Sequence, residues 1–201
     1  AMTVQPENDA TVVSCGGSPL ASAKLIRDVE PHDVPPVPTE EARAAMASYP
    51  GHTFHPFPTC YVCGTGRDEG DGMRIFPGRV GDAEGRQRVA SVWTPHESMA
   101  EDTHTYVDEH RRASVANTWA ALDCIGGWAG DMAERLMVLG RMVTAVDTLP
   151  VIGEEHVLVG AKKGAEGRKT FTASTLYDND GRVVARAEHV WIAIDPETFG
   201  R

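Results

Sequence analysis

Four residues of types that bind zinc lie within the short segment HTFHPFPTCYVCG, which runs from His52 to Gly64. Imidazole nitrogens and thiolate sulfurs are ligands that Zn²⁺ prefers, and the candidates are His52, His55, Cys60 and Cys63. The two pairs are unusually close, because structural zinc sites generally take their ligand pairs from two separated turns. Pro56 and Pro58 also stiffen the chain between the pairs, which limits how it can fold back around one ion.

This segment has two interpretations. The favoured one is a tight turn, permitted by Gly64, that leads into the first strand with its thiols reduced and packed and no metal required. The alternative is a zinc-containing structural protein in which both histidines and both cysteines hold the ion. A thioredoxin-like redox role is not indicated, since that role needs a Cys-x-x-Cys that opens a helix after a strand.

A second candidate for chemistry is one aspartate in the segment ASVANTWAALDCIGGWAGDM, where apolar residues recur at helical spacing. At steps of three or four, this predicted helix has a row of small residues that only Asp123 interrupts. An acid in an apolar stripe is costly unless it is paired, for example with a backbone amide or an arginine, or has a chemical role. Gly126 and Gly127 each weaken the helix by roughly 1 kcal/mol, which predicts close approach by a ligand or another backbone.

The elements around this aspartate are predicted from hydrophobic periodicity and turn residues. Strand patterns precede the predicted helix at 113–132, and a group of strand patterns follows it without a further helix. Because the later strands are joined by short turns, an antiparallel sheet is expected, and the fold class is α+β. The predicted strands are 71–80, 86–95, 136–150, 156–164, 169–177 and 182–194.

The segment WAALDCIGGWA, after two strands and before four, resembles the helix of the hotdog fold, in which a curved antiparallel sheet wraps around one long central helix. The chain is similar in particular to the thioesterase superfamily of the phenylacetate-pathway type, and CYVCG with DGMRIFPG resembles its actinobacterial members. The resemblance covers roughly residues 57–195. It implies an acyl-CoA thioester as substrate, no required cofactor, and a site between the subunits of a homodimer or higher homo-oligomer.

The resemblance places Asp123 at the acidic position of the superfamily, where it would act as general base or nucleophile. Members often have His-Gly-Gly at the start of the helix, whereas this chain has Ser-Val-Ala there. The amides of Val115 and Ala116 would still polarise the thioester carbonyl, because a helix N-terminus offers free N–H groups. Asn117 and Thr118 would orient the water or the substrate.

The substrate's other groups have candidate contacts as well. Arg111 and Arg112 precede the helix, where they could clamp a CoA phosphate, and Gly127 would allow close approach of the substrate. Because the His-Gly-Gly segment is missing, a non-catalytic hotdog module that binds an acyl-CoA or a related ligand remains an alternative to the thioesterase.

Composition narrows the remaining classes of function. The chain has 201 residues and a formal net charge of -10, so nucleic acid and anionic membranes are unfavourable partners. No apolar run is long enough to span a bilayer, and the N-terminus lacks the pattern of a secretory signal. The four unevenly spaced cysteines do not form a disulfide framework, which favours the cytoplasm. The expected organisation is a Pro/Gly-rich arm with a short helix at 1–56 and a hotdog domain at 57–201.

Overall fold

The structure, a computed structural model, describes residues 2–101 and 110–197 of the chain. Its contacts divide the chain into two compact units, Ala1–Glu30 and Pro31–Arg201. This division falls earlier in the chain than the domain boundary that the sequence predicts near residue 56. Residues 31–56 thus belong by their contacts to the larger unit.

The smaller unit contains strands that the sequence interpretation missed. β1 (Met2–Glu7), β2 (Ala10–Cys15) and β3 (Ser18–Ala23) form an antiparallel sheet in that order. The turn between the last two strands is Gly-Gly, and both glycines have positive φ, 57° and 85°. Glycine adopts these angles without steric cost, so the pair closes a hairpin in a segment that we expected to be an extended arm.

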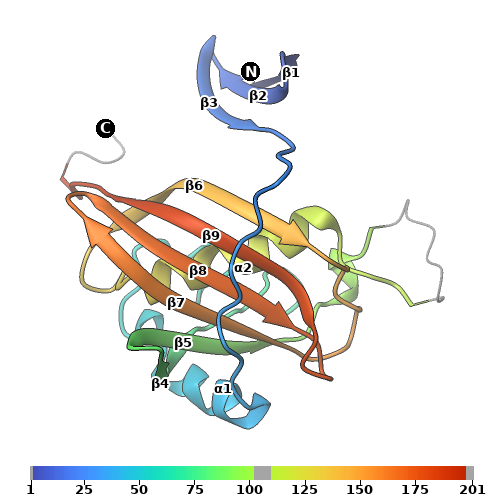
Figure 1. The fold of residues 1–201 in the computed structure, drawn as a ribbon, viewed down its shortest axis with the longest axis vertical. Coiled ribbons are helices and arrows are strands. Elements are labelled where there is room, and N and C mark those ends of the chain that lie inside the picture. The colour runs from blue at the N-terminus through green and yellow to red at the C-terminus, as the bar shows by residue number, and fades with distance from the viewer. Residues whose placement is uncertain (1, 102–109, 198–201) are drawn as a thin grey trace. The chain divides into compact units, whose positions relative to one another are not determined.

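The larger unit is built on a six-stranded antiparallel sheet with the order β4-β5-β7-β8-β9-β6. Helix α2 (Val115–Ala129) connects two strands of this sheet and packs against one face of it (Figure 1). This topology, a curved antiparallel sheet around one helix, is the hotdog fold that the resemblance implied. The strands are β4 (Gly78–Ala83), β5 (Arg86–Trp93), β6 (Met137–Val146), β7 (His156–Glu166), β8 (Lys169–Tyr177) and β9 (Val183–Ala193).

The central helix is shorter than the predicted segment 113–132, since α2 has 15 residues. At its start, Ser114 is extended (ψ 160°) and its Oγ accepts a hydrogen bond from the N–H of Asn117 at 3.1 Å, which caps the first turn. At its end, Gly130 is the C-cap and Asp131 has a left-handed φ of 67°. These two caps stop the helix although its hydrophobic pattern continues on both sides.

The predicted strand at 71–80 is wrong over most of its length. β4 begins only at Gly78, and residues 53–77 contain no helix or strand. Arg74 has a φ of 55°, a left-handed conformation that a strand cannot accommodate. The apolar residues of this segment are nevertheless buried, among them Met73, Ile75 and Phe76. The alternation of apolar residues in this segment therefore reflects burial of a loop, not a strand.

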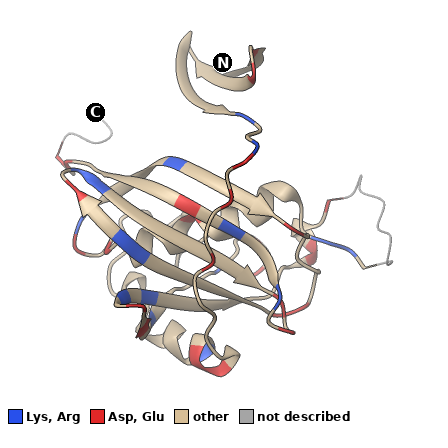
Figure 2. Ribbon diagram, in the orientation of Figure 1, with Lys and Arg blue, Asp and Glu red and all other residues tan. Residues whose placement is uncertain are grey.

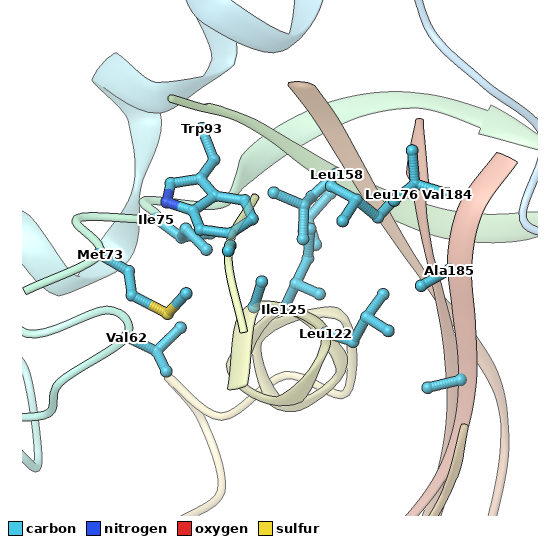
Figure 3. Packing of buried hydrophobic residues seen from close by; sticks show 14 of the residues in the cluster. Val62, Met73, Ile75, Trp93, Leu122, Ile125, Leu158, Leu176, Val184 and Ala185 are labelled. Carbon is cyan, nitrogen blue, oxygen red and sulfur yellow. The ribbon is translucent and has the colours of Figure 1, made fainter. Parts of the chain in front are cut away.

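The main core lies between α2 and the sheet (Figure 3). Leu122 and Ile125 project from the helix toward the strands, where Leu158 and Leu176 meet them, and all four are fully buried. Burial of each such side chain contributes about 1.5–3 kcal/mol. A Cβ on Gly160 of β7 would lie 2.8 Å from the backbone oxygen of Ile125, so a glycine there allows the helix to sit this close to the sheet.

The opposite face of the sheet is covered by residues 31–45. The short helix predicted within residues 1–56 is present as α1 (Thr39–Ala45), and Val34 and Val37 of the preceding segment are buried in the same cluster. Arg88 fastens this segment, because its Nη1 donates to the carbonyl of Pro35 at 2.7 Å. The remaining short helices are the 3-10 turns η1 (Met46–Ser48), η2 (Pro50–His52) and η3 (Glu97–Met99).

Charged residues of both signs are interspersed along the sheet, as Figure 2 shows. On β7 and β9, for example, Lys163 pairs with Glu188 at 2.6 Å. No helix in the described part of the chain is long and apolar enough to span a membrane.

Candidate functional site

Asp123 lies in the third turn of α2 and is half-buried. Its Oδ1 is buried and has no hydrogen-bond partner among the described residues. Burial, together with the negative charge of Cys60, raises the pKa of Asp123 to about 6. A buried carboxylate oxygen without a partner is uncommon in folded proteins and calls for an explanation. The sequence allowed a purely structural Asp123, paired with a backbone amide or an arginine. No such partner contacts Oδ1 among the described residues.

The start of α2 presents backbone N–H groups at an exposed surface. Val115 and Ala116 are exposed, and they occupy the first two helical positions after the Ser114 cap. With a rise of 1.5 Å per residue, Asp123 lies about 12 Å further along the helix axis than Val115. One carbonyl group cannot contact both the first amides and the carboxylate of the same helix.

The two polar side chains near the helix start are engaged in local hydrogen bonds. Asn117 Nδ2 donates to the carbonyl of Met99 at 2.8 Å, and Asn117 Oδ1 accepts the hydroxyl of Tyr61 at 3.0 Å. Thr118 is fully buried, and its Oγ1 donates to the carbonyl of Ser114 at 2.9 Å. Both side chains thus hold the first turn in place.

The two arginines before α2 differ in their surroundings. Arg112 Nη1 donates to the carbonyl of Leu149 at 2.7 Å, which ties this residue to the loop after β6. Arg111 is half-exposed, and its Nη1 lies 4.0 Å from the carboxylate of Glu97. Arg111 therefore has the more accessible guanidinium of the two.

The glycines of α2 are packed against side chains of the sheet. A Cβ on Gly127 would lie 2.5 Å from Met132 Cε and 3.1 Å from the Trp191 ring. A Cβ on Gly126 would lie 2.7 Å from His189 Nδ1. The close approach predicted from these glycines is thus made by core side chains.

His189 is a fully hydrogen-bonded core residue, as expected for a lone histidine on an apolar strand face. Its Nε2–H donates to the carbonyl of Leu122 at 3.0 Å, and its Nδ1 accepts the hydroxyl of Thr172 at 3.2 Å. The Thr172 oxygen in turn accepts Trp191 Nε1–H at 3.1 Å. Burial lowers the pKa of His189 to about 4, so the ring is neutral at neutral pH.

The neutral His189 predicts a loss of stability in acid. The unfolded chain protonates this histidine near pH 6.5, whereas the folded chain excludes the proton until about pH 4. Stability is therefore complete above pH 6.5 and falls by on the order of 3 kcal/mol as the pH drops toward 4. Urea unfolding of the parent and of His189→Gln should show a free-energy difference that shrinks with falling pH. A difference that stays constant would contradict this assignment.

Cys60, Cys63 and Cys124 converge beside Asp123, and their three sulfur atoms lie within 4.8 Å of one another. Cys60 Sγ lies 3.6 Å from Cys124 Sγ and 3.7 Å from Cys63 Sγ. His55 is buried with its Nε2 at 3.3 Å from Cys63 Sγ. His52, by contrast, is exposed, and its Nε2 contacts the carbonyl of Met46. The structure thus brings together three of the four sequence candidates and adds Cys124.

Contacts among the three thiols shift the pKa values of Cys60 and Cys124 in opposite directions. Hydrogen bonds from the Cys124 and Cys63 thiols, and from the backbone amides of Cys63 and Val62, lower the pKa of Cys60. The bonds to Cys60 and Cys63, together with burial, raise the pKa of Cys124 well above its usual value. Sequence reasoning missed Cys124 because it lies on α2, far along the chain from the Cys-x-x-Cys, and no local pattern connects the two.

A cleft of about 560 Å³ opens near the start of α2. Its wall includes Met73, Phe76, Trp93 and Met99, and Asp123 is not among its lining residues. The carbonyl of Met99 accepts N–H groups from Ser114 and Asn117, which joins the cleft to the first turn of the helix. The cleft and the carboxylate are therefore separate within one chain.

Two further features of the larger unit lie at its surface. Val115 and Trp119 on α2 are 52% and 39% exposed. Strand β6 is at an edge of the sheet and pairs only with β9 among the described strands. Its 10 residues form a long sheet edge, which natural proteins usually pair or cover.

Comparisons with known proteins were made for the whole chain. No family model and no curated protein matches it. Among solved structures, the chain is similar to a Streptococcus mutans protein bound to acetyl CoA, with 12% identity, a TM-score of 0.47, and coverage of 59% of this chain and 88% of the other.

Two further solved structures are similar to the chain over much the same length. For zebra fish thioesterase superfamily member 2, identity is 16%, the TM-score is 0.44, and coverage is 59% of this chain and 81% of the other. For the E. coli PaaI protein from the phenylacetic acid degradation operon, the corresponding values are 10%, 0.45, 57% and 80%. The solved structures that this chain resembles thus include proteins of the thioesterase superfamily that the helix motif indicated.

Proposed function

We propose that this chain is an acyl-CoA thioesterase in which Asp123 is the general base. The observation that carries the proposal is the buried Oδ1 of Asp123, which has no hydrogen-bond partner in the described part of the chain. The class of reaction follows from the resemblance of WAALDCIGGWA to the helix of hotdog thioesterases. Asp123 accepts a proton from water, and the water oxygen attacks the thioester carbonyl carbon. The C–S bond then breaks, and the leaving CoA thiolate takes the proton back from Asp123, which gives a carboxylic acid and the CoA thiol.

The active site is shared by two copies of the chain. The separation of about 12 Å between the first amides of α2 and Asp123 supports this assignment, because one carbonyl cannot reach both in a single subunit. A second α2, running antiparallel to the first, brings the partner subunit's Asp123 to the amides of Val115 and Ala116. The exposed Val115 and Trp119 and the unpaired edge of β6 provide the surface for such a dimer.

The substrate is held by features around the helix start. The acyl group occupies the apolar cleft that includes Trp93 and Met99, and the carbonyl lies at the exposed amides of α2. Arg111, the more exposed of the two arginines, contacts a phosphate of CoA, whereas Arg112 mainly positions the loop to which it is bonded.

Asp123→Asn tests the role of the carboxylate. The amide keeps the size of the side chain but cannot accept a proton from water, so we expect release of CoA to fall by at least about 10²-fold. CoA release is measured by chromatography over a panel of acyl-CoA substrates, and circular dichroism checks the fold. Turnover at the parent's rate in this variant would refute the mechanism.

A second candidate function is binding of an acyl thioester without hydrolysis. It is favoured by the cleft, which does not include Asp123 among its lining residues. Calorimetric titration with acyl-CoA separates the two functions, because the binding module predicts saturable binding with the thioester intact. Release of CoA by the parent, lost in Asp123→Asn, decides for the enzyme.

A further inference from the structure

The sulfur atoms of the cysteine cluster have the spacing of metal ligands. In a tetrahedral zinc site with Zn–S bonds of about 2.3 Å, two bound sulfurs lie about 3.8 Å apart. The distances from Cys60 Sγ to Cys124 Sγ and to Cys63 Sγ are 3.6 and 3.7 Å. Cys60 and Cys63 form a Cys-x-x-Cys pair, a ligand spacing that structural zinc sites use, and Cys124 of α2 adds a third sulfur.

The turn that carries Cys60 and Cys63 is shaped for metal binding. The N–H of Gly64 donates to the carbonyl of Cys60 at 2.9 Å, and a Cβ on Gly64 would lie only 2.5 Å from that oxygen. This short contact shows that only a glycine fits at position 64, where the tight turn after Cys63 closes.

His55 supports the cluster from its buried side. Its Nδ1 accepts the backbone N–H of Phe57 at 2.9 Å, so the ring proton sits on Nε2. Nε2 lies 3.3 Å from Cys63 Sγ and donates its hydrogen to that sulfur. In this geometry His55 is a positioning residue for the Cys63 thiolate, and hydrogen bonds of this kind orient and stabilise metal ligands.

The cluster also accounts for the order of an unusually long loop. Residues 53–77 contain no helix or strand, yet Val62 and Cys63 are buried within this segment. Loops of this length without secondary structure are uncommon in compact domains. A metal that joins Cys60 and Cys63 to Cys124 of α2 cross-links the loop to the central helix.

We propose that Cys60, Cys63 and Cys124 bind one zinc ion as thiolates, with His55 supporting Cys63 and one nitrogen or oxygen donor at the fourth position. The site differs from the set first suggested by the sequence, because His52 is excluded and Cys124 replaces it. The ion has a structural role in this proposal, which goes beyond the proposed hydrolase activity and does not depend on it.

Metal analysis of the full-length protein, purified without added zinc, tests the site directly. We expect about one zinc per chain in the parent and less than about a tenth of that in Cys60→Ser and Cys124→Ser. Cys15→Ser is the matched control, since Cys15 is exposed in the smaller unit and should leave the zinc content unchanged. His55→Ala should weaken zinc affinity by about 10–100-fold.

A second measurement covers the case in which the cysteine variants do not fold. Chelation of the parent should lower its melting temperature, and added zinc should restore it. Cobalt added to the chelated protein should give the charge-transfer absorption of bound thiolates, and X-ray absorption of the zinc form should show three sulfur and one lighter scatterer. A parent that holds no zinc and binds neither metal would overturn the proposal, as would equal zinc loss in Cys15→Ser. Asp123→Asn should keep its zinc, which separates this test from that of the hydrolase.

Discussion

Heterodimers that combine an Asp123→Asn subunit with a Val115→Pro subunit are expected to hydrolyse thioesters at about half the parent's rate, although each variant alone is inactive. In the shared site, the amides of one α2 act with the carboxylate of the other. A heterodimer then has one site with both defects and one site with none. If both groups came from the same subunit, every site in the heterodimer would be defective.

Val115→Pro is suited to this experiment because it removes one backbone N–H and preserves the helix. Proline is favoured at the first helical position, and Ser114, with φ −63° and ψ 160°, has the extended conformation that a residue before proline prefers. Loss of an N–H that polarises a carbonyl costs about 10²–10³-fold in rate. Val115→Ala is the matched control, since it shortens the side chain and keeps the N–H.

The heterodimer is isolated from cells that express both chains with different affinity tags, and CoA release is measured per dimer. Size-exclusion chromatography with light scattering shows that each variant still forms the parent's oligomer. If the heterodimer assembles normally but is as inactive as each of the two single variants, a site shared between subunits is ruled out. It would leave the role of Asp123 to be judged by the single variant.

Gly78→Ala is expected to cost about 3 kcal/mol of folding free energy, the upper end of the usual cost of overpacking. Gly78 is the first residue of β4 and packs against the last residue of α1. An added Cβ would lie 1.6 Å from the carbonyl oxygen of Ala45 and 2.4 Å from the carbonyl carbon. Both atoms are backbone, so no side chain can rotate away. The short helix and the strand must separate, which uncovers the valines packed beneath residues 31–45.

Gly81→Ala in the same strand is the matched control. A Cβ there meets only Glu41 Oε1 at 3.8 Å, an ordinary contact, so the change should be near neutral. Urea denaturation of both variants measures the difference. Equal stability of the two variants would show that α1 yields at this contact and that the packing is softer than the distances indicate.

Hydrophobic periodicity and turn residues correctly predict the elements in which the periodicity is strong. The predicted strand at 169–177 is confirmed without change as β8, and the predicted strands at 156–164 and 182–194 differ from β7 and β9 by only one or two residues at their ends. The motif around Asp123 also identified the central helix and, through the resemblance, the hotdog arrangement. These features are local, since they depend on side-chain alternation and on turn residues that neighbours in the chain specify.

Contacts between residues far apart in the sequence are visible only in the folded chain. The segment at 71–77 alternates like a strand, but the left-handed backbone at Arg74 makes it a buried loop. Cys124 lies beside Cys60 and Cys63, whereas His52 lies away from them and contacts Met46. The loop folds back onto α2 to bring the three cysteines together, and no local sequence pattern encodes this contact. That Oδ1 of Asp123 is buried without a hydrogen-bond partner among the described residues is likewise a property of the folded chain. Burial and long-range contact set the chemistry of these groups, and both are properties of the folded chain.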